Sequence, residues 1–185
     1  MNETTVPLLT LEEFQSTRDP AHGWTELFRG QEVVRPWPTF RQAIVKSNIG
    51  FAIRVYLNEN RIGRIAFSSG VITERDPDTV RGPDVSFYSA ARLPFGVEVI
   101  AYHDLPPNWC VEVRSPSNTK AELRAKAHEY LAGGVRLVWV VDPEDRTVTV
   151  FENKLKSTVF ESHATLAAES VLPGFSCLVS DFFNG

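Results

Sequence analysis

The chain has 185 residues, of which 43% are hydrophobic and 23% are charged. This is enough apolar material for one sizeable core, so we expect residues 1–185 to form a single domain. The formal net charge of −4 excludes a protein that coats nucleic acid through bulk positive charge, but not an enzyme whose basic residues surround one cleft. Neither a signal peptide nor a membrane-spanning stretch is evident. We therefore expect no membrane partner. Because Cys110 and Cys177 lack metal-type spacing, we expect them to be reduced thiols in a cytoplasmic protein.

Two helices are expected in the first third of the chain. Thr10 and Glu13 have the spacing of a capping box, which predicts a short helix. A longer helix is expected after Pro38, ending within residues 58–63. Its apolar stripe is predicted to consist of Phe40, Ile44, Phe51, Ala52, Val55 and Tyr56.

Short strands are expected around these helices. Arg29-Gly30-Gln31 is typical of a tight hairpin turn, and residues 74–82, rich in Asp, Pro and Gly, predict a loop. The predicted strands are residues 24–28, 32–34, 63–67 and 71–73.

Two further strands each carry one carboxylate. Asp84 stands in the segment RGPDVSF, and Glu112 stands in the segment WCVEVRSPS. Alternation places Glu112 and Arg114 together, on the face opposite the bulky apolar residues. Two carboxylates that meet at a sheet edge form a site for a hard divalent cation, so we predict that Asp84 and Glu112 hold Mg²⁺ or Mn²⁺. The alternative for each acid alone is a solvated position near a strand end.

The second half of the chain predicts a strand, a helix and a buried strand, which together imply a mixed sheet. The helix is expected to start after Ser117 or Asn118 and to run to about Ala132, before Gly133-Gly134. Its inner stripe is predicted to be Leu123, Ala127, Tyr130 and Leu131. The buried strand is expected at residues 135–141, an antiparallel partner at 147–151, and a packed tail at 179–183.

Lys126 lies at the margin of that helical stripe, and the helix starts directly after the Glu112 strand. Its amine is therefore predicted to reach the carboxylates, to orient or deprotonate an attacking water, and to offset charge on a phosphate. The alternative is a lysine that extends to solvent. Arg114 remains protonated, so it is predicted to bind a substrate phosphate or to pair with an acid.

Glu26 is the remaining acidic candidate, in an apolar early strand where it needs a partner. That partner is either a water on the metal or simply Arg29 or Arg35. Several cations are candidates for contacts with backbone phosphates, with a solvated surface as the alternative, and Arg81 is taken as substrate-binding among them. The other members of this set are Arg41, Lys46 and Arg75.

The order Pro83-Asp84, then Glu112-Val113-Arg114, then a helical Lys126 resembles the PD-(D/E)XK nuclease superfamily. More narrowly, the chain is similar to the Uma-two family, described as restriction endonucleases. Further matching segments are Glu26–Gly30, Gly82–Phe87, Val111–Ser117, Lys126 with Tyr130, and Gly134-Val135 through Trp139–Pro143. The resemblance implies a restriction-endonuclease-like core, a mixed α/β sheet flanked by helices, and Mg²⁺-dependent DNA hydrolysis.

Under this resemblance, Asp84 and Glu112 are the metal ligands, Lys126 supplies the amine, and Glu26 matches the early acidic position. Arg114 departs from the pattern, because the family usually has an apolar residue there. Arg41 likewise stands near the place of a common histidine.

The leading hypothesis from the sequence is a metal-dependent DNA endonuclease, and a homodimer would supply two sites for cutting two strands. The alternative is a catalytically inactive nuclease fold that binds DNA or a protein partner. A third interpretation, a structural protein with decorative surface acids, predicts that Asp84 and Glu112 lie far apart.

Overall fold

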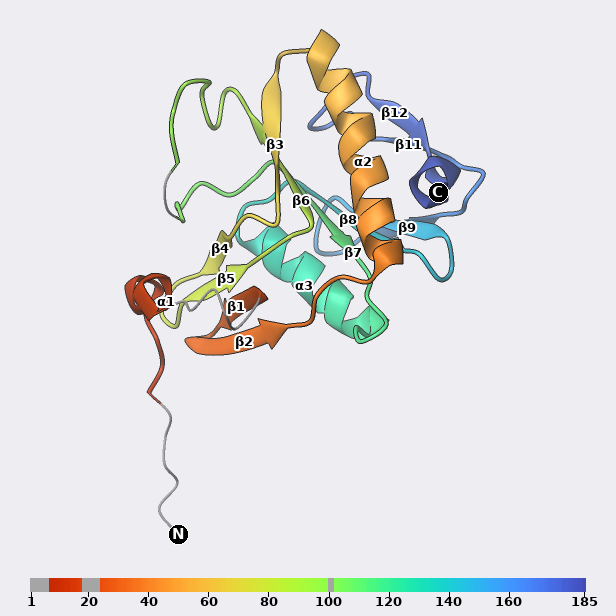
Figure 1. The fold of residues 1–185 in the computed structure, drawn as a ribbon. Coiled ribbons are helices and arrows are strands. Elements are labelled where there is room, and N and C mark those ends of the chain that lie inside the picture. The colour runs from red at the N-terminus through yellow and green to blue at the C-terminus, as the bar shows by residue number, and fades with distance from the viewer. Residues whose placement is uncertain (1–6, 18–23, 100–101) are drawn as a thin grey trace.

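The computed structural model describes residues 7–17, 24–99 and 102–185 and shows a mixed α/β architecture (Figure 1). Its largest sheet has six strands in the order β10-β9-β8-β7-β6-β3. These strands are β3 (Gly63–Phe67), β6 (Val85–Ser89), β7 (Trp109–Val113), β8 (Leu137–Asp142), β9 (Thr147–Phe151) and β10 (Ser157–Phe160). Neighbouring strands are antiparallel except β7 and β8, which pair in parallel, so the predicted mixed sheet is confirmed.

Helix α3 (Lys120–Ala132) makes the connection between the two parallel strands. Its N-cap is Thr119, which forms a capping box with Glu122, so the helix starts slightly later than predicted from Ser117 or Asn118. Leu123, Ala127 and Tyr130 are buried, as the predicted stripe requires. Ala127 and Tyr130 pack in one cluster with Cys110 of β7 and Val138 of β8, on one face of the large sheet.

Helix α2 (Phe40–Glu59) covers the opposite face of the sheet. The predicted stripe for this helix is only partly right. Ala52 and Tyr56 pack against the core, but Phe40 and Phe51 are 82% and 71% exposed and Val55 is also exposed. The buried face instead consists of Val45, Ile49, Gly50, Ile53 and Leu57. Both stripes are apolar and have helical spacing, so periodicity alone does not decide which of them meets the sheet.

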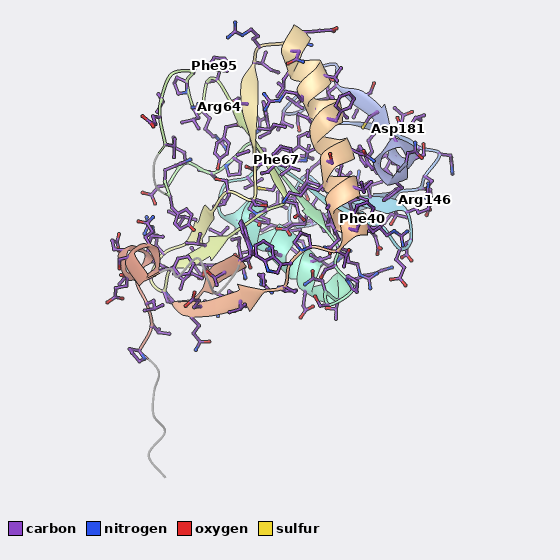
Figure 2. The ribbon with its side chains drawn as sticks, in the orientation of Figure 1. Phe40, Arg64, Phe67, Phe95, Arg146 and Asp181 are labelled. Carbon is purple, nitrogen blue, oxygen red and sulfur yellow. The ribbon has the colours of Figure 1, made fainter. Side chains whose placement is uncertain are left out.

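The contact between α2 and the edge strand β3 is unusually close. A Cβ added at Gly50 would lie 2.3 Å from the ring of Phe67, the last residue of β3. The next residue, Ser68, receives a hydrogen bond from Lys46, one helical turn before Gly50. Figure 2 labels Phe40 at the start of this helix and Phe67 beside it. The absence of a side chain at position 50 therefore makes room for the Phe67 ring against α2.

A second sheet has four strands in the order β2-β1-β5-β4. These are β1 (Trp24–Phe28), β2 (Gln31–Arg35), β4 (Val71–Glu74) and β5 (Thr79–Arg81). Arg29 and Gly30, with φ of 49° and 75°, form the two-residue turn of the predicted hairpin. Strand β5 lies in the segment predicted to be a loop, and that part of the prediction is wrong. The Asp and Pro residues of the segment mark only its turn, whereas Val80 is buried and pairs with Leu27 of β1.

Helix α1 (Leu11–Thr17) has the predicted capping box between Thr10 and Glu13, and its Leu11 and Phe14 pack onto β1 and β5.

At the other end of the chain, β11 (Thr165–Ala167), β12 (Ser176–Leu178) and the 3-10 helix η2 (Val179–Phe183) close the α2 side of the core. The predicted packing of the tail is therefore confirmed. Within the three described ranges, no helix is both long and apolar enough to cross a bilayer.

Candidate active site

Asp84 and Glu112 meet where two neighbouring strands pass each other. Asp84 immediately precedes β6, and Glu112 is the second-last residue of β7, whose Val111 pairs with Val85. The backbone N–H of Val113 donates to Oδ2 of Asp84 at 2.7 Å, which ties the aspartate to the end of the Glu112 strand. Both side chains line one cavity of about 660 Å³. The separation required by a purely structural interpretation is therefore absent.

Lys126 extends from α3 between two glutamates. Its Nζ lies 2.8 Å from Oε1 of Glu112 and 2.8 Å from Oε1 of Glu26. Its side chain is only 14% exposed, so the solvated alternative does not describe this lysine. Although burial lowers the pKa of Lys126, the charges of Glu112 and Glu26 outweigh this effect and raise it. The amine is therefore held as an ammonium ion.

Glu26, in the middle of β1, is surrounded by positive groups. Its Oε2 accepts from Arg35 at 2.7 Å and from Arg81 at 3.3 Å, and its Oε1 accepts from the backbone N–H of Gly82 at 3.0 Å. Burial alone would raise the pKa of Glu26, but Lys126, the Gly82 hydrogen bond and Arg35 lower it to about 2. Arg35, one of the two expected partners, is present, whereas Arg29 lies near Glu74 instead.

Glu112 has much weaker compensation. Burial raises the pKa of Glu112 to about 7; the charge of Lys126 opposes this shift, and the charges of Asp84 and Glu26 add to it. Tyr130, one turn after Lys126 on α3, donates its hydroxyl proton to Oε1 of Glu112 at 2.6 Å. This carboxylate is therefore oriented by two groups of α3 but is only partly neutralised.

A second cation faces Asp84 from the other side of the cavity. Lys46 of α2 has its Nζ 3.4 Å from Oδ1 of Asp84 and also donates to Ser68. The sequence analysis placed Lys46 among cations that contact backbone phosphates or form a solvated surface, and did not assign it to the carboxylates. The signal that could have located it is the buried stripe through Val45 and Ile49, whose margin carries Lys46.

The arginines predicted to bind substrate occupy different positions. Arg81 lines the cavity, but its guanidinium is bound to Glu129 at 2.7 Å and stacks on Phe28, with 4.4 Å to the ring centroid. Arg114 follows the end of β7 and is not among the cavity-lining residues. It pairs with Asp142 at 3.0 Å and with Glu144 at 3.1 Å, which is the ion-pair alternative.

The remaining scattered cations also have protein partners. Arg41 donates to the carbonyl of Pro143, and Arg75 pairs with Asp78 and Asp104.

The donor set fits a small divalent cation. Mg²⁺ is commonly held by one or two carboxylates with waters and substrate phosphates, rather than by an all-protein cage. Asp84 and Glu112 provide two such carboxylates, and the raised pKa of Glu112 shows that added positive charge would be favourable there. Among the described residues, no group of three or more His, Cys, Asp or Glu side chains forms a fuller site. The protein would thus supply two ligands to the metal ion, Asp84 and Glu112.

Comparison with solved structures defines the class of the fold. A crystal structure titled as a "putative nuclease belonging to DUF820" from Anabaena variabilis superposes with a TM-score of 0.82. The match covers 95% of this chain and 97% of that one, at 22% sequence identity. The chain therefore has the same fold as that protein.

Residues 11–180 match the Uma2 family, whose description is "Putative restriction endonuclease". The chain belongs to this family, as the sequence motifs indicate. A comparison with curated proteins found no significant match.

Proposed function

We propose that this protein is a metal-dependent endonuclease that hydrolyses phosphodiester bonds of DNA. The family and the fold support a restriction-endonuclease-like nuclease. The observation that carries the specific chemistry is the shared cavity of Asp84, Glu112 and Lys126, in which Glu112 is buried and incompletely neutralised. Such a carboxylate is costly unless a cation joins it.

In this proposal Asp84 and Glu112 hold Mg²⁺, and Mn²⁺ takes the same place. When bound, the metal supplies Lewis acidity and positive charge toward the phosphate. Lys126 remains an ammonium ion beside Glu112, so it orients the attacking water and stabilises charge that develops on the phosphate. Lys46, beside Asp84, offers a second cation on the opposite wall.

The other groups keep these side chains in place. Glu26, fixed by Arg35 and Arg81, holds the amine of Lys126 from the side away from Glu112. Tyr130 fixes the carboxylate of Glu112 through its 2.6 Å hydrogen bond. We assign Glu26 and Tyr130 to positioning because their contacts go to Lys126 and Glu112.

A direct test is cleavage of plasmid and oligonucleotide DNA by the purified protein with Mg²⁺, Mn²⁺ or EDTA. Asp84→Asn and Glu112→Gln are expected to lose cleavage by about 10³-fold or more while staying folded. Glu161→Gln, at an exposed position of the tail, is the matched control and should keep full activity. Intact DNA under all metal conditions would contradict the proposal.

Metal binding needs a measurement that does not depend on cleavage. We expect Mn²⁺ to raise the melting temperature of the wild-type protein, because a ligand that binds only the folded state stabilises it. The increase should vanish in Asp84→Asn and persist in Glu161→Gln.

An inactive binding module is the second candidate, and one observation favours it. Lys126 already neutralises part of the charge of Glu112 and of Glu26, so these acids have a resident cation without any metal. This candidate predicts no melting-temperature shift with Mn²⁺ and no cleavage, while DNA or a protein partner still binds.

A further inference from the structure

The cavity above the carboxylates has an aromatic wall that the proposed chemistry does not use. Trp24, Phe28 and Trp37 line it, together with Pro36 and Pro38. The wall comes from the β1–β2 hairpin and from the segment that leads from β2 into α2 (Figure 1). A nuclease that touched only phosphates would need cations here, because phosphates do not stack on indole rings.

Trp37 is the most exposed part of this wall. It is 77% exposed, although large aromatic side chains usually bury most of their surface. The prolines on both sides restrict the backbone of the segment, so little conformational entropy is lost when a ligand packs on the ring. The other two rings already have neighbours, since Phe28 carries the Arg81 guanidinium and Trp24 packs on the backbone of Gly82.

The acidic centre lies deeper than this wall. Glu112 is 6% exposed and the Lys126 side chain is 14% exposed, so a phosphate must enter the cavity to reach them. A volume of about 660 Å³ is in the range that encloses a small ligand, and it suits a nucleotide. The paired bases of a continuous duplex are stacked inside the helix and cannot lie against Trp37.

The charges around the cavity agree with a strand that enters from the aromatic side. Arg35, next to the Pro36–Pro38 segment, is 32% exposed, and Lys46 of α2 is 19% exposed. Both cations line the cavity and keep part of their surface accessible, while Arg35 pairs with Glu26 and Lys46 with Asp84. Proteins bind single strands by stacking successive bases on aromatic side chains while the phosphates lie along cationic side chains.

We propose that the site takes an unpaired nucleic-acid strand, with one base stacked on Trp37 and the adjacent phosphate directed to the carboxylates and Lys126. This inference rests on the proposed function for the place of the reacting phosphate. It also removes the need for two active sites, because cutting one strand requires only one.

Binding of labelled DNA, measured by fluorescence anisotropy in EDTA, separates recognition from cleavage. One oligonucleotide sequence is compared as a single strand, as a duplex with an unpaired bulge, and as a perfect duplex. We expect the first two to bind about tenfold or more tightly than the perfect duplex, the effect of stacking one base. Single-stranded DNA should also quench tryptophan fluorescence, since Trp109 and Trp139 are fully buried and leave the cavity tryptophans to respond.

Trp37→Ala is expected to weaken single-strand binding about tenfold. Trp37→Phe should restore most of it, because phenylalanine also stacks. Phe51→Ala removes an aromatic side chain of similar exposure that is not among the cavity-lining residues, and it should bind like wild type. Size-exclusion chromatography of each variant tests the other occupant of an exposed tryptophan, a second copy of the chain.

The inference fails if the perfect duplex binds as tightly as the single strand, if Trp37→Ala binds normally, or if Trp37→Ala splits a dimer without affecting DNA binding. Cleavage assays with Mg²⁺ keep the two proposals apart. Trp37-dependent binding without any cleavage supports this inference and contradicts the nuclease. Equal cleavage of both DNA forms by wild type and Trp37→Ala contradicts this inference and leaves the nuclease intact.

Discussion

Glu26 and Glu112 contact the same Lys126 amine at the same 2.8 Å distance, and both are nearly inaccessible to solvent. Their protonation nevertheless differs, since the pKa of Glu26 is about 2 and that of Glu112 is about 7. Glu26 has Arg35, Arg81 and a backbone N–H besides the lysine. The comparison shows that burial alone does not decide the charge of an acid, and that the number of its positive partners does.

The difference assigns separate tasks to the two acids. A carboxylate as well satisfied as Glu26 gains little from a metal and serves to anchor Lys126. A carboxylate that is desolvated and short of positive partners, as Glu112 is, has free energy to gain from a divalent cation. The predictions below test this division, beginning with the largest expected effect.

Removing the shared lysine should affect both acids. Lys126→Met is expected to lower cleavage by about 10²- to 10³-fold, because a positive group beside the phosphate is lost. It should also lower the free energy of unfolding by about 3 kcal/mol, since Glu26 and Glu112 remain buried without their common partner. Urea unfolding and cleavage rates measure the two effects.

The matched control is Lys120→Met on the same helix, whose side chain is 68% exposed and pairs with Asp145 at the surface. Equal losses in the two variants would contradict the role of Lys126.

Glu26→Gln should destabilise the protein. The shift of the Glu26 pKa from 4.5 to about 2 corresponds to about 3 kcal/mol of stability at neutral pH. Because the folded-state pKa is lowered, this stability is present above pH 4.5 and is lost as the pH falls toward 2. Urea unfolding at several pH values should show the difference from wild type shrinking over this range.

Glu32→Gln, at an exposed position of β2, serves as the control for Glu26→Gln and should change stability little. A pH-independent difference between Glu26→Gln and wild type would mean that packing, not charge, is responsible.

Glu112→Gln should have the opposite sign. The Glu112 pKa is raised from 4.5 to about 7, so ionised Glu112 costs stability that increases as the pH rises from 4.5 through 7. The variant is therefore expected to be more stable than wild type by about 3 kcal/mol at pH 8 in EDTA, with the gain disappearing below pH 4.5. Thermal unfolding in EDTA measures this, and a variant less stable than wild type at pH 8 would refute it.

Arg114→Ala is expected to have the smallest effect on chemistry. Its guanidinium contacts Asp142 and Glu144 outside the cavity, so cleavage rates should stay within about twofold of wild type. A large loss with unchanged circular dichroism would return Arg114 to substrate binding.

The sequence was sufficient for the carboxylates because Glu112 stands in a short apolar strand and Asp84 directly before another, so that the strand pattern limits where each side chain lies. Lys126 followed from its place at the margin of the α3 stripe. Lys46 was not located, because α2 has apolar residues on two sides and the wrong side was chosen. The bonds of Arg81 to Glu26 and Glu129 join three distant segments, and local patterns contain no information about such meetings.

The strand β5 was also missed, for a related reason. Its three residues are too few to show a period, and only their pairing with β1 and β4 makes them a strand. A strand that exists only because neighbouring strands pair with it, and that has no periodic pattern of its own, cannot be predicted from local sequence.

Gly50 is not among the cavity-lining residues, but it lies on the same helix as Lys46 and can affect the active site through that helix. A side chain there would meet the Phe67 ring, so either this half-exposed ring must turn away or α2 must shift over the edge strand. Lys46 lies one turn before Gly50 on the same helix, so a shift of α2 would also move its amine relative to Asp84. Where α2 shifts, a substitution at this glycine would change the distance between Lys46 and Asp84 without replacing any side chain of the reaction centre.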